Sequence, residues 1–125
     1  MIARDLALAA ATAAIDKKGL DPVLIDVSGQ SSYADYLLLV SGRSERQVQG
    51  LADAIADALA PLGAEPLGVE GRGSHWVVLD YADVVVHLFH HPVRDFFDLE
   101  GLWIDAPRVA LRVPAESRLS AADAY

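Results

Sequence analysis

YLLLVSGRSERQVQGLADAI, residues 36 to 55, contains the patterns of a buried strand and an amphipathic helix in direct succession. Residues 36–42 are apolar at almost every position, which is typical of a strand covered on both faces. Ser44 and Gln47 have the spacing of a capping box, so we expect the helix to begin at this serine. Apolar side chains then follow the 3.6-residue period as far as Leu59. The stretch therefore predicts an α/β protein.

The remaining segments extend this pattern along the chain. They predict a first helix over residues 2–18, further strands at 23–27 and 66–71, a hairpin over 75–90 that turns at 80–83, and a short helix or helical turns with exposed aromatic side chains over 93–103. The expected fold is a mixed sheet of about five strands with flanking helices. We expect one domain over residues 1–105. Residues 106–125 lack a sustained period and are expected to form a C-terminal tail that is poorly ordered or lies on the surface.

The composition limits the classes of function. The chain has 125 residues, 53% of them hydrophobic and 22% charged, which suits one folded domain. The absence of cysteine excludes disulfides and thiolate metal sites. No apolar run approaches the roughly 20 residues that span a bilayer. Residues 6–15 resemble the core of a signal peptide, but Asp5 stands where positive charge is expected, so we expect a cytoplasmic protein.

The charge distribution favours a protein partner over a nucleic acid. The net charge is −8, and Lys17 and Lys18 are the only adjacent basic residues. Binding to a phosphate backbone requires clustered lysine and arginine, so we do not expect nucleic-acid binding as the main activity. An acidic chain instead attracts a basic protein.

The hairpin sequence HWVVLDYADVVVHLFHHP, residues 75 to 92, contains all four histidines but does not predict a metal site. Strand alternation places His87 and His90 on opposite faces, whereas metal ligands must converge to about 2 Å from the ion. Asp80 and Asp83 flank a turn, where aspartate commonly hydrogen-bonds its own backbone. The glycine-rich residues 68–73 are not followed by a helix, which argues against a phosphate loop. We therefore expect no catalytic residues, no metal and no cofactor.

Trp76 is the most informative residue of the hairpin. It shares a strand face with Asp80, and Tyr81 follows at the turn. Tryptophan is often a core residue, but Trp and Tyr are also enriched among the anchors of protein interfaces. Between residues 69 and 105 there are seven acidic residues and two arginines. An aromatic patch rimmed with negative charge suits docking to a basic protein.

Residues 26–55 and 66–103 resemble the ribosomal silencing factor family, also known as RsfS, YbeB or Iojap-related proteins. The resemblance rests on the motifs SS-x-ADY, SG-x-S-x-RQV, a tryptophan strand followed by LDY-x-DVVVH-x-F, and a closing R-x-F-x-DLE-x-LW. It covers nearly all of residues 3–105 and excludes the segment after Pro107.

The resemblance implies a translational repressor that is not an enzyme. Such factors bind the large ribosomal subunit through ribosomal protein L-fourteen and sterically block joining of the small subunit when nutrients are limited. The family fold is related to nucleotidyltransferases but lacks their catalytic carboxylates, and members are seen as homodimers. Carried over by position, the resemblance places a set of side chains at the partner surface: Trp76, Leu79, Asp80, Tyr81, Asp83, His87 and Arg94, the last with the segment that runs on to Trp103. We also expect Glu70 and Asp80 to pair with basic side chains of the partner.

Two other functions stay open at this point. A nucleotidyltransferase-like enzyme or metal-dependent hydrolase would bind a nucleotide or a metal ion. A self-associating scaffold would use the Trp76 face only for its own homodimer.

Overall fold

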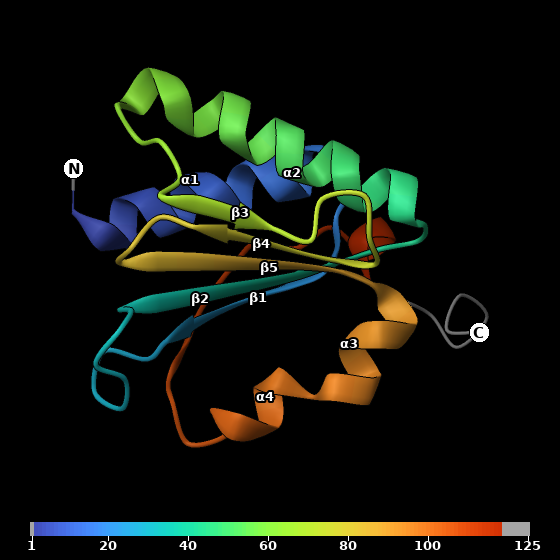
Figure 1. Ribbon diagram of the computed structural model, residues 1–125. Helices are drawn as coiled ribbons and strands as arrows, with labels where there is room; N and C mark the ends of the chain where they lie inside the picture. Colours follow the sequence, from blue (N-terminus) through green and yellow to red (C-terminus); the bar gives the residue numbers. More distant parts are fainter. Residues whose placement is uncertain (1, 119–125) are drawn as a thin grey trace.

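A mixed six-stranded sheet lies between two layers of helices in the computed structural model, which describes residues 2 to 118 (Figure 1). The elements are α1 (Ala3–Asp16), β1 (Leu20–Asp26), β2 (Tyr36–Gly42), α2 (Glu45–Leu59), the 3₁₀ turn η1 (Ala60–Leu62), β3 (Gly68–Glu70), β4 (Trp76–Asp80), β5 (Val84–His90), α3 (His91–Phe97), α4 (Leu99–Leu102), β6 (Arg108–Val109) and the 3₁₀ turn η2 (Ala115–Ser117). The strand order is β3-β4-β5-β2-β1-β6. Helices α1 and α2 cover one face of the sheet, and α3 and α4 lie on the other (Figure 1).

Strand β2 lies at the centre of this sheet, as its sequence predicts. It pairs in parallel with β5 on one side and antiparallel with β1 on the other, which makes the sheet mixed. Every residue of β2 after Tyr36 is buried. The predicted α/β class is confirmed.

The predicted cap of α2 is also present, with one difference. The Ser44 side chain accepts a hydrogen bond from the Gln47 backbone N–H at 3.1 Å. In a standard capping box the residue-47 side chain would return to the N–H of Ser44. Here Gln47 Oε1 accepts from the Arg43 N–H at 2.6 Å, and its Nε2 donates to the Lys18 carbonyl at 3.0 Å. Gln47 therefore joins the start of α2 to the end of α1.

Strand β1 begins earlier than the sequence pattern predicts. It starts at Leu20 rather than residue 23, and its register with β2 shifts between Leu20 and Val23. Pro22 lies within the shift and has no N–H to give to a ladder, so it is tolerated at such an irregularity. The proline hides the first part of the strand from a sequence pattern.

The segment after residue 105 contributes to the sheet, which corrects the expected five strands to six. Val109 and Arg108 pair antiparallel with Leu24 and Ile25 of β1, and the Asp26 N–H donates to the Pro107 carbonyl at 2.9 Å. A strand of two residues is too short to show any alternation, so the sequence suggested only a tail. The last part of that expected tail, residues 119–125, lies outside the described residues.

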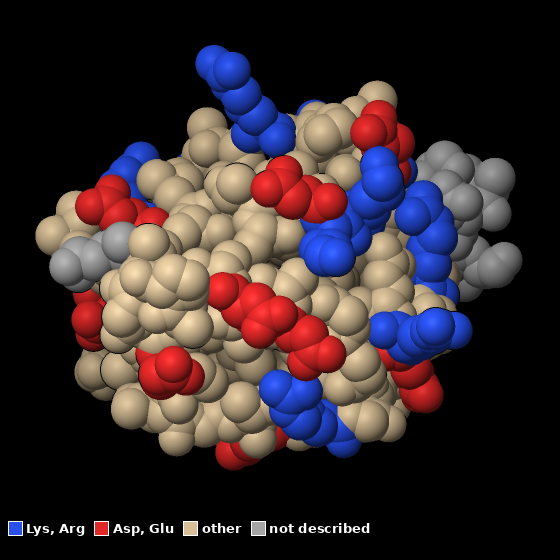
Figure 2. All heavy atoms as spheres, turned by 90° about the horizontal axis from the view of Figure 1, so that it is seen from above, with Lys and Arg blue, Asp and Glu red and all other residues tan. Residues whose placement is uncertain are grey.

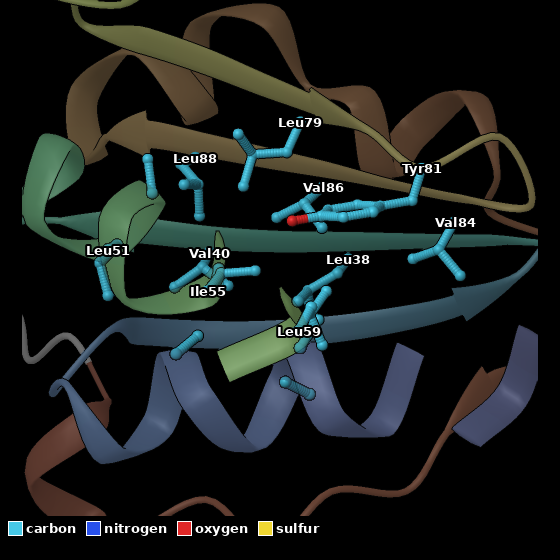
Figure 3. Close-up of a cluster of buried hydrophobic side chains, with 14 of the residues drawn as sticks. Leu38, Val40, Leu51, Ile55, Leu59, Leu79, Tyr81, Val84, Val86 and Leu88 are labelled. Carbon is cyan, nitrogen blue, oxygen red and sulfur yellow. The ribbon is translucent and has the colours of Figure 1, made fainter. Parts of the chain in front are cut away.

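The layer formed by α1 and α2 is charged outside and apolar inside. Its outer surface carries side chains of both signs, with Lys and Arg gathered toward one side (Figure 2). Beneath it lies the larger core, in which side chains from α1 and α2 meet one face of the sheet (Figure 3). Its larger members include Leu24, Leu38, Val40, Leu51, Ile55, Leu59, Val77, Leu79, Tyr81, Val84, Val86 and Leu88.

The opposite face of the sheet has a smaller core. Its buried members are Ile25, Val27, Ala34, Leu37, Leu39, Val85, Phe89 and Ala106. Val93 of α3 and Leu99 of α4 pack against this cluster together with Trp103, and all three are only partly buried. Helices α3 and α4 have 7 and 4 residues, against 14 and 15 in α1 and α2, so this second layer is much the smaller.

The turn between β3 and β4 requires glycine at residue 71. Gly71 has φ +79°, and a Cβ on it would overlap the Trp76 carbonyl oxygen. Gly73 has φ +82°, but a Cβ there would meet nothing within 4 Å. The positive φ favours glycine at both positions. Only at residue 71 would a Cβ also overlap backbone atoms.

We expect Gly71→Ala to lower the free energy of unfolding by about 2 kcal/mol or more, because the chain beside Trp76 must move. The matched change Gly73→Ala should cost about 1 kcal/mol, which is the backbone-angle penalty alone. Urea unfolding of both variants measures the difference. Equal losses would contradict the close approach at Gly71.

Candidate functional site

The sheet face opposite α1 and α2 is incompletely covered over β3, β4 and β5. We call this region the open face and define it by Glu70 of β3, Trp76, Val78 and Asp80 of β4, and Val85 and His87 of β5, with Tyr33 and Phe97 at its borders. The strand register places these side chains together, because Glu70 pairs with Val78 and Val78 pairs with His87. Its floor holds a hollow of about 320 Å³ lined by Tyr33, Gly68, Glu70, Val78, Asp80, Val85 and His87.

Trp76 is half-buried at the centre of an aromatic cluster. Its ring centroid lies 5.0 Å from that of Phe89 and 4.8 Å from that of Phe97, both at tilted angles. Phe89 is buried beneath it, whereas Phe97 of α3 is 47% exposed. Ring pairs at such distances attract one another beyond their area of contact. The indole is thus held from two sides and keeps part of its surface exposed.

His87 is bonded to the same indole. Trp76 Nε1 donates a hydrogen bond to His87 Nδ1 at 3.1 Å, and the two ring centroids lie 5.9 Å apart. Burial lowers the pKa of His87 from 6.5 to about 4, because the charged imidazolium loses its hydration. The imidazole is therefore neutral at neutral pH.

Two exposed carboxylates lie beside this cluster. Glu70 and Asp80 both line the hollow, and Asp80 also accepts a hydrogen bond from the Ala82 N–H at 2.8 Å, which shapes the β4–β5 turn. Asp83 is exposed at the same turn, and its carbonyl oxygen accepts from the Asp35 N–H at 2.8 Å. That bond fixes the end of the loop that carries Tyr33. The open face thus combines an apolar centre with negative charge.

Comparison with known proteins identifies the family. Residues 2–124 match the family described as "Ribosomal silencing factor during starvation". The chain belongs to this family. A relative from Bacillus subtilis named "Ribosomal silencing factor RsfS" is 42% identical over 99 residues, which cover 78% of this chain and 84% of the relative. A relative of the same name from Halalkalibacterium halodurans is 39% identical over 109 residues, covering 86% and 93%.

Solved structures support the same relationship. A crystal structure of a protein from Chromobacterium violaceum is similar with a TM-score of 0.81 and 34% identity, covering 92% of this chain and 96% of that one. The family match also extends past residue 105, where the motifs in the sequence end. This agrees with the pairing of β6 in the sheet.

Two residues that the family resemblance assigned to the partner surface lie in the opposite core. Leu79 is fully buried and Tyr81 is 7% exposed, and both point toward the α1–α2 layer (Figure 3). Leu79 lies three positions after Trp76 on β4, so strand alternation places the two side chains on opposite faces of the sheet. The Tyr81 hydroxyl is buried without a hydrogen-bond partner among the described residues, and burial raises its pKa. Both side chains therefore belong to the core rather than to the exposed surface.

Arg94, another residue assigned to the partner surface, is also buried. Its guanidinium is buried and donates to Glu100 Oε1 at 2.8 Å, to the Asp21 carbonyl at 2.7 Å and to Ser41 Oγ at 3.0 Å. These bonds connect α3 with α4 and with the ends of β1 and β2. Arg94 is thus buried in contacts within the chain rather than presented at the surface.

Sequence reasoning missed Tyr33 as a site residue. It is 63% exposed on the loop between β1 and β2 and lines the hollow. The signal was a single aromatic residue in the polar segment SGQSSYAD, residues 28–35. Phe97 belonged to the predicted exposed aromatics of residues 93–103, but its contact with Trp76 joins segments that no local pattern relates.

Sites of other kinds are not assembled in the described part of the chain. Over residues 2–118, no group of three or more His, Asp or Glu side chains is arranged to hold a metal ion. Among the helices of the same residues, none combines the length and the apolar character of a membrane span.

The burial of His87 predicts a specific pH dependence of stability. The unfolded chain takes up a proton near pH 6.5, whereas folded His87 resists it down to about pH 4. The free energy of unfolding should therefore decrease as pH falls through this window, by on the order of 3 kcal/mol. In His87→Asn this contribution is absent, so its stability should decrease less between pH 6.5 and 4. Denaturant titrations at several pH values test this, and equal slopes for both proteins would contradict it.

Proposed function

We propose that this chain is a ribosomal silencing factor that binds the large ribosomal subunit through ribosomal protein L-fourteen. In this proposal the bound factor sterically blocks joining of the small subunit and so lowers translation when nutrients are limited. The observation that carries it is the open face centred on Trp76, in a chain that belongs to the family. A homodimer and a cytoplasmic location are part of the same proposal.

The chemistry of the open face supports a basic protein as partner. Trp76, Phe97 and Tyr33 supply partly exposed aromatic surface, of the kind enriched at interface centres. Glu70 and Asp80 place carboxylates beside it. Proteins that lie on ribosomal RNA must carry lysine and arginine to contact phosphates, so they offer the complementary charge.

Steric exclusion needs no chemical step. An interface of standard size, about 1,600 Å², is sufficient for a specific complex. The proposal therefore assigns the protein no catalytic residue. A nucleotidyltransferase-like or hydrolytic function would instead require nucleotide or metal binding, and calorimetric titration with Mg²⁺ and ATP distinguishes the two. A scaffold that only self-associates is separated by comparing large-subunit binding of a monomeric variant with that of the dimer.

We expect Trp76→Ala to weaken binding to large ribosomal subunits by about 30-fold or more, because the central anchor of the face is lost. Co-sedimentation with purified subunits measures this, and circular dichroism checks the fold. Tyr36→Ala is the matched control, since Tyr36 is a partly buried aromatic that packs against the core on the opposite face. If Trp76→Ala co-sediments at the wild-type level, the assignment of Trp76 as the anchor is wrong.

The carboxylates should contribute through charge. Glu70→Lys is expected to weaken binding about tenfold and to lower the association rate, since it places a cation where a basic partner approaches. Asp57→Lys makes the same charge change on exposed α2 and should bind normally. Association rates at low and high salt measure both effects. The basic-partner assignment is wrong if the two variants behave alike.

A further inference from the structure

The hydrogen bond between Trp76 and His87 determines where His87 carries its proton. A neutral imidazole has one nitrogen that accepts and one that donates. His87 Nδ1 accepts from the Trp76 indole N–H at 3.1 Å, so the proton must lie on Nε2. Trp76 thereby fixes one tautomer of His87.

The Nε2 edge of this ring is the one left for a further contact. His87 lines the hollow of the open face, and its Nδ1 edge is turned toward Trp76, which does not line that hollow. Within residues 2–118, Nε2 makes no hydrogen bond, and it is not among the fully buried unpartnered atoms. The hollow is thus provided with one oriented N–H donor.

The residues that line the hollow determine which kind of group can accept a hydrogen bond from His87 Nε2–H. Val78 and Val85 form apolar walls, and Glu70 and Asp80 add two carboxylates. These carboxylates would repel a phosphate or another carboxylate, whereas a neutral carbonyl oxygen meets no such opposition. A protein segment suits both features, because its backbone supplies carbonyl oxygens while its basic side chains can reach the carboxylates.

We propose that the hollow is a subsite for a segment of the partner protein, in which His87 Nε2–H donates a hydrogen bond to a carbonyl oxygen of that segment. The inference rests on the proposed function for the identity of the partner. It adds that Trp76 has two roles, as an apolar anchor and as the residue that orients the His87 donor. His87 is accordingly a specificity residue that rejects partners without an acceptor at this place, since a bound partner would cover the donor and leave it unpaired.

The first test uses the free full-length chain and needs no partner. Nitrogen-15 NMR of the histidine side chains should show His87 protonated on Nε2 and unprotonated on Nδ1 from pH 7.5 down to pH 5.5. A proton on Nδ1 would overturn the tautomer assignment. So would a loss of the neutral form within that range.

The second test adds isolated ribosomal protein L-fourteen to the labelled chain. The His87 Nε2 proton should move downfield and exchange more slowly with water when the carbonyl oxygen accepts it. An unchanged Nε2 proton in a formed complex would overturn the proposal. If the wild-type chain does not bind this protein at all, the proposed function fails, while the tautomer result from the free chain is unaffected.

A substitution measures the contribution of the donor to affinity. His87→Asn keeps an acceptor oxygen near the position of Nδ1 and removes the Nε2–H, so binding should weaken about fivefold, the range of one net hydrogen bond. Slow exchange of the Trp76 indole proton should persist and thereby show that the anchor is still held. His75→Asn is the matched control and should bind within a factor of two, because His75 is exposed and, among the described residues, its ring is not paired with the indole. Wild-type affinity in His87→Asn would contradict the donor role.

Discussion

The burial of β2 on both faces is the constraint from which the rest of the architecture follows. A strand with no exposed residue after Tyr36 requires cover above and below the sheet. One cover is large, because α1 and α2 together have 29 residues. The other is short and leaves part of β3, β4 and β5 accessible. This inequality between the two layers separates a face that serves stability from a face that can serve recognition.

Much of the fold could be predicted because its signals are local. Continuous apolar residues identified β2, and the Ser44 cap with its 3.6-residue period identified α2. The elements that the sequence did not predict depend on contacts between distant segments of the chain. Strand β6 is defined by pairing with Leu24 and Ile25, more than 80 positions earlier in the chain, and two residues carry no period of their own. The early start of β1 was hidden by Pro22 for a similar reason, since the proline interrupts the local pattern.

The candidate site was predictable to the extent that strand alternation governs it. Alternation placed Trp76 and Asp80 together, and both lie on the open face. Leu79 was assigned to the same surface by resemblance alone, although its odd position on β4 already pointed it to the opposite core. Arg94 could not be placed from sequence, because its partners Asp21, Ser41 and Glu100 come from three separate elements or their flanks.

The buried Arg94 has a consequence for the interpretation of mutational screens. Its guanidinium holds α3 against the ends of β1 and β2, and Phe97 at the end of that helix packs on Trp76. Lysine keeps the charge but cannot reproduce bonds that leave a planar group in several directions. Loss of Arg94 would therefore release a helix that supports Trp76, the proposed anchor. In a binding screen such a variant would score as defective through the lost support of Trp76, although Arg94 itself is buried. Its distance from the indole would not reveal that the effect is indirect.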